Sequence, residues 1–192
     1  QKSVSDSLQA GLWGLILVAL FMIIYYRLPG VLSVISLAIY GLVTLAIFKL
    51  WPVTMTLAGA AGFILSVGMA VDANVLIFER FKEELRAGRS LSNAIDEGFS
   101  RAWTSIRDGN FTTIIVCLVL MYFSTSIIKG FAITLFLGVL ISMFTAIIVT
   151  RNCLKLINER WLEKHKWVVG IKEKKVKQVE VQIEEDNENK LI

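Results

Sequence analysis

The sequence predicts an all-α membrane protein: a bundle of five transmembrane helices, with a cytoplasmic amphipathic helix between the third and the fourth. Hydrophobic residues make up 55% of the 192 residues and the mean hydropathy is +0.65, values that exclude an ordinary soluble domain. Five apolar runs follow one another, each about 18 to 26 residues and therefore long enough to cross a bilayer. Short breaks separate most of these runs, and one longer polar connection separates the third from the fourth.

The boundaries of the spans follow from the residues that interrupt the apolar runs. Pro29 and Gly30 end the first run because neither continues a helix readily, and Pro52 separates the second run from the third. A further break around residues 124–130 separates the last two runs. These three turns are tight, which favours antiparallel neighbouring helices. The predicted spans are residues 8–26, 31–48, 53–78, 111–128 and 130–149.

The distribution of basic residues predicts on which side of the membrane each connection lies. The long connection, residues 79–110, contains six Arg and Lys residues, and the positive-inside rule places it in the cytoplasm. By alternation, the loop at Arg27 lies inside, whereas the loops at Lys49 and Lys129 lie outside. Each outside loop then carries a single basic residue, which agrees with the same rule.

The two ends of the chain lie on opposite sides of the membrane, because the number of spans is odd. We predict an extracytoplasmic stub at residues 1–7, a transmembrane domain at 8–157 and a cytoplasmic charged tail at 158–192. The tail is expected to be solvated and mostly disordered. Contact of its basic part with anionic lipid or ribosomal RNA is the alternative. Since the chain begins with Gln1, we expect that a natural N-terminal part precedes it.

The long cytoplasmic connection is predicted to contain an amphipathic helix at residues 90–106. Ser90 suits the N-cap position, and apolar residues recur on one face of this segment while charged residues fall largely on the other. Such a helix lies along the inner membrane surface or packs against the cytoplasmic ends of the bundle, and the two arrangements are compatible. After it, Asp108, Gly109 and Asn110 are expected to cap the fourth span rather than to act in transport.

The third run contains a carboxylate, Asp72, among apolar residues. Insertion scales assign roughly 2.5 to 3.5 kcal/mol to an Asp near the centre of a membrane helix, which favours a functional role. We therefore predict that Asp72, with Asn74, forms a proton relay. A structural Asp that is hydrogen-bonded to a neighbouring helix is the alternative. No Lys or Arg lies in the apolar part of any run, so a positive partner within the membrane would have to come from another chain.

Small residues recur every four positions in the third and fifth runs, a pattern typical of membrane helices that pack closely. The supporting residues that we predict are the packing glycines Gly62, Gly68 and Gly138 and the hydrogen-bonding residues Ser66, Ser142 and Thr145. Generic helix packing without a further role is the alternative for these stripes. Glu79 lies on the same helix face as Asp72, about 10 Å further on, where it helps proton exit or simply marks a charged helix end.

Nothing in the sequence is typical of catalysis or of metal binding. No nucleophile stands beside a base, no glycine-rich phosphate loop occurs, and the single histidine, His165, lies in the charged tail. Cys117 and Cys153 lack further ligands at metal-binding spacing, so we predict neither a zinc site nor a disulfide framework. We expect a transporter rather than an enzyme, with no cofactor, with lipid around it and with no nucleic-acid partner.

The motif around Asp72 carries a family resemblance. Residues 68–80 read GMAVDANVLIFER, and they resemble the fourth helix of SecD-type chains in the SecD/SecF family of protein-export membrane proteins, within the resistance-nodulation-division superfamily. Further similar stretches are YYRLPG at 25–30, AIDEG at 94–98 and GFAITL at 130–135. SecF-type chains tend to carry an Asp-Thr pair here, and drug exporters commonly carry paired Asp residues. Gly109 departs from the family pattern, which more often has Ala.

The resemblance implies that this chain is the C-terminal membrane half of a SecD-type protein, comprising its spans two to six. It implies that Asp72 links the proton-motive force to movement of an outer domain. The implied partners are SecF, the SecYEG channel, the SecA motor and a secreted polypeptide. The expected function is a proton-motive-force-driven accessory subunit of the Sec translocase in the bacterial plasma membrane, acting late in protein export. A small-molecule or lipid exporter and a passive membrane scaffold are the alternatives.

Overall fold

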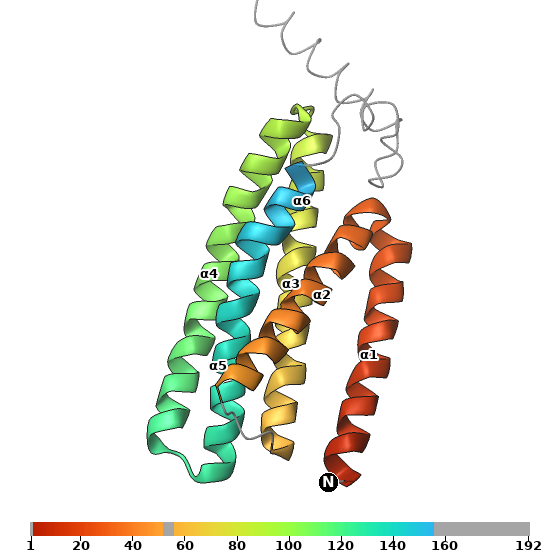
Figure 1. The fold of residues 1–192 in the computed structure, drawn as a ribbon. Helices are drawn as coiled ribbons and strands as arrows, with labels where there is room; N and C mark the ends of the chain where they lie inside the picture. Colours follow the sequence, from red (N-terminus) through yellow and green to blue (C-terminus); the bar gives the residue numbers. More distant parts are fainter. Residues whose placement is uncertain (1, 52–55, 156–192) are drawn as a thin grey trace, which may run out of the picture.

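The computed structural model describes residues 2–51 and 56–155, and the regular elements in these ranges are helical (Figure 1). In chain order they are α1 (Lys2–Tyr26), α2 (Leu28–Leu50), α3 (Leu57–Arg86), α4 (Leu91–Phe123), α5 (Ser126–Thr145), the π-helical turn η1 (Ala146–Thr150) and α6 (Arg151–Lys155). Five helical segments are long and apolar enough to cross a membrane, the fifth being α5, η1 and α6 together. The prediction of an all-α bundle of five spanning helices is confirmed. The predicted tail and residues 53–55 lie outside the described residues.

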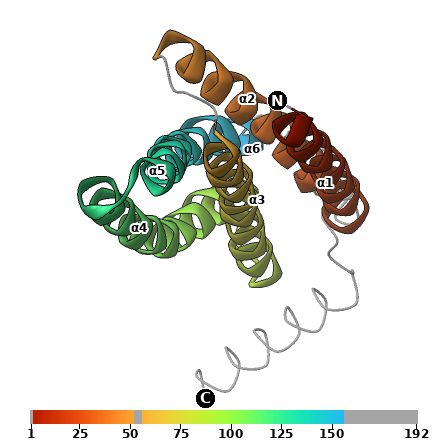
Figure 2. The ribbon, with the colours of Figure 1, turned by 90° about the horizontal axis from the view of Figure 1, so that it is seen from below.

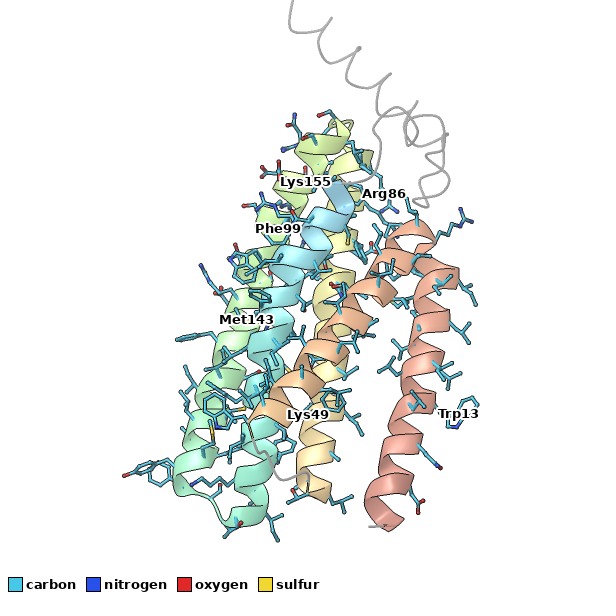
Figure 3. All side chains as sticks on the ribbon, in the orientation of Figure 1. Trp13, Lys49, Arg86, Phe99, Met143 and Lys155 are labelled. Atoms are coloured by element: carbon cyan, nitrogen blue, oxygen red, sulfur yellow. The ribbon has the colours of Figure 1, made fainter. Side chains whose placement is uncertain are left out.

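The helices alternate in direction and bring their charged connections to one end of the bundle. Helices α3, α4 and α5 form the centre, α2 crosses them obliquely, and α1 lies at the edge beside α2 (Figures 1 and 2). The end at which α3 leads into α4 also holds Arg27 and α6, and we call it the charged end. Lys49 lies toward the opposite end (Figure 3).

The turn between α1 and α2 is sharp because three residues favour it. Arg27 has a φ of 56°, a left-handed conformation that is uncommon outside glycine. Pro29 stands in the first turn of α2, where an N–H has no helical partner. At Gly30 the helices come so close that a Cβ would overlap the carbonyl oxygen of Met22. Helix α2 therefore begins at Leu28 rather than at residue 31.

Helix α3 extends well beyond the predicted third span. It begins after Thr56, whose side chain accepts a hydrogen bond of 3.0 Å from the Gly59 N–H, and it ends at Arg86 rather than at residue 78. The charged extension stays helical because Glu, Lys and Arg are good helix formers and pair here at i, i+3 spacing. Gly88, with a φ of 82°, then allows the chain to reverse.

Helix α4 joins two elements that the sequence predicts separately. It runs without interruption from Leu91 to Phe123, so the amphipathic segment at residues 90–106 continues directly into the fourth span. This segment packs against the charged extension of α3, and a Cβ on Gly98 would lie 2.7 Å from the backbone nitrogen of Phe81. The structure therefore has the segment packed at the end of the bundle and not as a separate surface helix.

The predicted capping role of Asp108, Gly109 and Asn110 is wrong, because all three lie inside α4. The threonines that follow, Thr112 and Thr113, donate to the carbonyl oxygens one turn earlier at 3.1 and 3.2 Å. Such bonds satisfy a hydroxyl within a continuous helix. The packing of the preceding segment on α3 outweighs the low helix propensity of Gly109.

The last two spans meet earlier than predicted. Helix α4 ends at Phe123, and Ser124 and Thr125 have extended backbones that form the turn. Helix α5 therefore starts at Ser126, and it takes up three residues that were assigned to the fourth span. The helical run then continues through η1 and α6 to Lys155.

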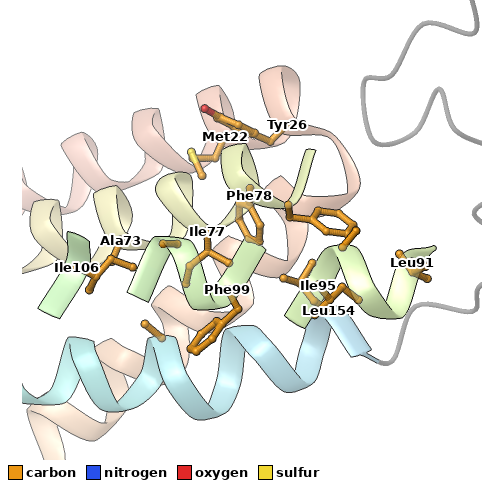
Figure 4. Close-up of a cluster of buried hydrophobic side chains, with 14 residues drawn as sticks. Met22, Tyr26, Ala73, Ile77, Phe78, Leu91, Ile95, Phe99, Ile106 and Leu154 are labelled. Carbon is orange, nitrogen blue, oxygen red and sulfur yellow. The ribbon is translucent and has the colours of Figure 1, made fainter. Parts of the chain in front are cut away.

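A buried apolar cluster holds the charged end together (Figure 4). Ile77, Phe78 and Phe81 of α3 are fully buried in it. Tyr26 of α1 and Leu154 of α6 also belong to it, together with residues from the first half of α4. The cluster thus fixes the ends of four helices and gives α3 a rigid setting.

Candidate functional site

Helices α3 and α5 pack along a seam of small and polar residues. The seam comprises Gly62, Ser66, Ala70 and Asn74 of α3, and Thr134, Gly138, Ser142, Ala146 and Thr150 of α5 and η1, all buried. A Cβ on Gly62 would lie 2.5 Å from Thr134 Oγ1 and 2.7 Å from the carbonyl oxygen of Phe131. A Cβ on Gly138 would overlap the side chain of Ser66. The two helices can approach this closely only because both positions are glycine.

Two hydroxyl groups link the seam to neighbouring backbone and side chains. Thr134 Oγ1 donates to the carbonyl oxygen of Gly59 across the seam, at 2.9 Å. Ser66 Oγ donates to the carbonyl oxygen of Phe63 at 2.7 Å and lies 2.7 Å from the hydroxyl of Tyr40. Because Ser66 has one hydrogen to give, Tyr40 is the donor of the second bond. The α2–α3 contact therefore includes a directed, buried hydrogen bond.

Three further polar side chains, which we call the polar triad, join α2, α3 and η1. Thr150 Oγ1 donates to Asn74 Oδ1 at 2.7 Å, and Ser36 Oγ lies 2.9 Å from Thr150 Oγ1. Since the single hydroxyl hydrogen of Thr150 goes to Asn74, Ser36 donates to Thr150. The exposed fractions are 1% for Ser36, 3% for Asn74 and 0% for Thr150, so water does not replace these bonds.

Ser142 and Thr145 bind their own helix. Ser142 Oγ donates to the carbonyl oxygen of Val139 at 2.8 Å, and Thr145 Oγ1 donates to that of Ser142 at 3.1 Å. Both side chains are buried, and neither is bound to Asp72. In the described part of the chain, these two predicted supporting residues therefore hydrogen-bond within α5 and not to Asp72.

Asp72 lies on the outer face of α3, away from the seam. Its side chain is exposed, and within residues 2–51 and 56–155 it has neither a hydrogen bond nor an ion pair. Asn74, two residues later, points inward because two residues turn an α-helix by about 200°. The structure thus separates the two residues that the sequence analysis assigned to one relay.

Gly68 shares the outer face with Asp72, one turn earlier. It is exposed, and no atom lies within 4 Å of the position that its Cβ would take. Gly68 is therefore not a packing glycine within this chain, contrary to our expectation. The physical reason is the four-residue register of the seam, which passes through Ser66 and Ala70 and leaves Gly68 on the opposite side.

The surroundings of Asp72 are apolar along the helix. At a rise of 1.5 Å per residue, Asp72 lies roughly 20 Å from either end of α3, near its middle. The exposed residues that precede it, Ala61, Ile64, Leu65 and Gly68, carry no charge. We call the surface from Ala61 to Asp72 the outer face of α3.

Glu79 belongs to a different charged group. Its carboxylate accepts a hydrogen bond of 3.4 Å from the Lys82 ammonium, which is only 5% exposed. The same ammonium lies 4.3 Å from the ring centroid of Tyr26 and 5.7 Å from that of Tyr25, a cation–π arrangement. Glu79 therefore helps to attach α1 to α3, and its partner is Lys82 rather than Asp72.

Further ion pairs fix the charged end. The buried Glu84 pairs with Arg89 at 3.0 Å and with Arg101 of α4. Asp96 of α4 pairs with the first and last residues of α6, each at 2.9 Å. These pairs connect α3, α4 and α6 at the charged end, whereas Asp72 lies near the middle of α3.

The described residues contain no group of three or more His, Cys, Asp or Glu side chains that is placed to hold a metal ion. Cys117 is buried, Cys153 is half-buried, and both are free thiols.

Ser36 and Tyr40 of α2 were not among the residues predicted from the sequence. A signal was present, because Ser33, Ser36, Tyr40 and Thr44 recur every three or four residues along the second span, and all four are buried. A polar stripe at helical spacing within an apolar run indicates a face that packs against other helices.

Comparison with known proteins identifies the family to which this chain is similar. The family described as "Protein export membrane protein SecD/SecF, C-terminal" matches residues 1–160. The protein translocase subunit SecD of Thermobaculum terrenum is 60% identical over 173 residues, which cover 88% of this chain and 34% of that protein. The protein translocase subunit SecDF of Bacillus subtilis is 44% identical over 181 residues, covering 94% of this chain and 25% of that protein.

A solved structure agrees with the fold. The crystal structure of SecDF in its super-membrane-facing form gives a TM-score of 0.73 at 33% identity, covering 85% of this chain and 22% of that one. The chain spans about a third or less of the length of these relatives. Their names describe transport and not catalysis, and the resemblance seen in residues 68–80 is confirmed. This chain belongs to the SecD/SecF family of protein-export membrane proteins, as its C-terminal membrane region.

Proposed function

We propose that this membrane bundle is part of a proton-motive-force-driven accessory subunit of the Sec protein translocase, which promotes the late stages of protein export. Membership of the family and the names of the relatives support a role in protein translocation. The proposal of proton coupling depends on one observation: in the middle of a spanning helix lies an exposed carboxylate that pairs with none of the residues that the structure describes.

The position of Asp72 supports proton coupling because its ionised and protonated states differ in how much free energy they cost among lipid tails. An ionised carboxylate among lipid tails is costly, whereas the protonated form is much less so. The group is therefore expected to bind a proton when its surroundings are apolar and to release it when water or a cation arrives. Alternation between these states would favour different arrangements of α3 relative to its neighbours.

A partner bundle is expected to cover the outer face of α3. Ile64 of this face lies against α1 at Gly11, whereas Gly68 and Asp72 are exposed, and Gly68 leaves room for another helix to approach. SecF, with a similar bundle, is the partner that the family implies, and it would supply the polar or cationic group for Asp72. SecYEG, SecA and the secreted polypeptide are the further partners of the whole protein.

The proposed location is the bacterial plasma membrane, with the charged end in the cytoplasm. The charged end holds Arg27, the basic residues of the α3–α4 connection and Arg151, whereas Lys49 and Lys129 lie toward the other end. The positive-inside rule orients such a bundle with its basic end in the cytoplasm. The C-terminus is then cytoplasmic.

The test replaces Asp72 in the full-length protein. Asp72→Asn keeps the size and removes the ionisable group, and we expect the stimulation of export by the proton-motive force to fall to the level of membranes without the protein. Asp108→Asn is the matched control, because Asp108 is an exposed carboxylate of α4 that pairs with Arg107 at 2.9 Å. Export would be measured in membrane vesicles at equal protein levels.

The outcomes separate the alternatives. The proposal is supported if the proton-motive force no longer stimulates export in Asp72→Asn but stimulates it fully in Asp108→Asn. Unchanged export with both variants contradicts it and favours a passive scaffold. Normal export combined with lost efflux of a lipid or small molecule favours an exporter.

A further inference from the structure

The polar triad meets the fifth span at an irregular turn. Residues Ala146–Thr150 form the π-helical turn η1, and Thr150 is its last residue. Residues four apart in an α-helix drift by about 40° at each step, so a stripe that continues over several turns gradually leaves its face. A π turn takes more residues per revolution and brings the next residue back. Thr134 and Thr150, far apart on the run, are both fully buried and both hydrogen-bond to α3.

The polar triad binds the inner face of α3 through Asn74, whereas Asp72 lies on the outer face of the same helix. Asn74 is fixed inside the bundle by Thr150, and Asp72 lies about 200° around the same helix. The rotation of α3 about its own axis therefore determines the position of both residues together. Any rotation that turned Asp72 toward α5 would carry Asn74 away from Thr150.

Such a rotation would leave buried polar groups without partners. Asn74 would lose the hydroxyl that it accepts from, and the Thr150 hydroxyl would lose its acceptor among side chains that exclude water, while Ser36 would keep its bond to Thr150. Unpaired polar groups in such surroundings are strongly disfavoured, and the bond from Ser36 strengthens the bond that Thr150 donates to Asn74. The triad opposes rotation of α3 in both directions.

We propose that Ser36 and Thr150 are positioning residues for Asp72: by holding Asn74 inside the bundle, they set the rotation of α3 and keep the Asp72 carboxyl on the outer face. This inference deepens the proposed function and rests on it for the role of Asp72. A shift of α3 during proton uptake or release has to break the Thr150–Asn74 bond. Breaking this bond is then the free-energy barrier between two rotational states of α3.

The experiment measures the orientation of α3 by cross-linking in the full-length protein. Ala70→Cys and Ile141→Cys place thiols on α3 and α5 within one buried cluster, in a background without other cysteines. We expect Thr150→Val and Ser36→Ala each to lower the yield of the 70–141 disulfide severalfold. Thr150→Ser keeps the hydroxyl and should restore the yield.

The matched control is Thr44→Val. Thr44 is also a fully buried threonine, but its hydroxyl donates to the carbonyl oxygen of Tyr40 in its own helix, at 2.8 Å. Thr44→Val should leave the cross-linking yield unchanged. A wild-type yield in both Thr150→Val and Ser36→Ala overturns the proposal, and so does a loss of the same size in Thr44→Val.

Two variants of the full-length protein, Asp72→Asn and Thr150→Val, test the proton role and the positioning role separately. Asp72→Asn tests proton-driven export and leaves the triad in place, whereas Thr150→Val removes a triad member and leaves the carboxylate in place. If Asp72→Asn exports normally while Thr150→Val loses the cross-link, the proton role fails and the positioning role stands. If Asp72→Asn abolishes export while Thr150→Val keeps the cross-link, the positioning role fails alone.

Discussion

The two faces of α3 differ in what covers them. The inner face carries Gly62, Ser66 and Asn74, and each of these meets an atom of α2, α5 or η1 at close range. The outer face carries Gly68 and Asp72, and no described side chain pairs with either. Both faces are rich in small residues, so composition alone does not distinguish them.

The difference shows how a single membrane helix serves two purposes. On the inner face, the Ser66 hydroxyl and the Asn74 side-chain oxygen both have hydrogen-bond partners on neighbouring helices, which makes that face structural. On the outer face, the Asp72 carboxylate is costly in lipid and has no hydrogen bond or ion pair with residues 2–51 or 56–155, so we expect its role to be functional. The same kind of substitution is therefore expected to have different effects on the two faces.

The largest difference in folding stability is expected between two Gly→Ala variants, one on each face of α3. Gly62→Ala should lower the free energy of unfolding by about 3 kcal/mol, because the new Cβ meets a backbone carbonyl oxygen that cannot move aside. Gly68→Ala should instead raise it by up to about 1 kcal/mol, since Ala is the better helix former and its Cβ meets open space. Reversible unfolding in mixed micelles measures both, and effects of equal sign and size would remove the distinction.

A second comparison uses neighbouring carboxylates of the charged extension. Glu84→Gln should lower the free energy of unfolding by about 2 kcal/mol, because the side chain is 4% exposed and binds two arginines. Glu83→Gln should change it by less than about 0.5 kcal/mol, since the Glu83 side chain is 45% exposed and its ion pair with Arg80 lies at the surface. The measurement is unfolding at low and high salt. A larger effect at Glu83 would contradict the assigned burial.

The smallest expected effect concerns one hydrogen bond of the inner face. Ser66→Ala should cost about 1 kcal/mol of unfolding free energy, because the Tyr40 hydroxyl loses its acceptor. Ser100→Ala, on an exposed position of α4, is the control and should be neutral. A double-mutant cycle with Tyr40→Phe isolates the pair, and a coupling energy near zero would show that the bond does not contribute.

Much of the inner face could be predicted from the sequence. Small residues at four-residue spacing indicate close packing of membrane helices, and Gly62 and Gly138 indeed lie where α3 and α5 meet. The orientation of Asp72 could not be predicted, because an isolated apolar run does not reveal which of its sides faces its own bundle. The same ambiguity led to the grouping of Gly68 with the packing glycines.

Two further features depend on contacts between distant segments. Asn74 finds its partners Thr150 and Ser36 on other spans, and no local pattern connects the three. The continuity of α4 through Gly109 depends on how its first half packs against α3 at Gly98. Tertiary packing, and not local helix propensity, determines both the partners of Asn74 and the continuity of α4.

The most direct test of the central claim observes the proton on Asp72. Infrared difference spectra of the full-length protein in bilayers, recorded between low and high pH, should contain a protonated carboxyl band that disappears on deprotonation. We expect Asp72→Asn to remove this band and Asp108→Asn to retain it. If the band survives unchanged in Asp72→Asn, Asp72 is not the group that takes up the proton.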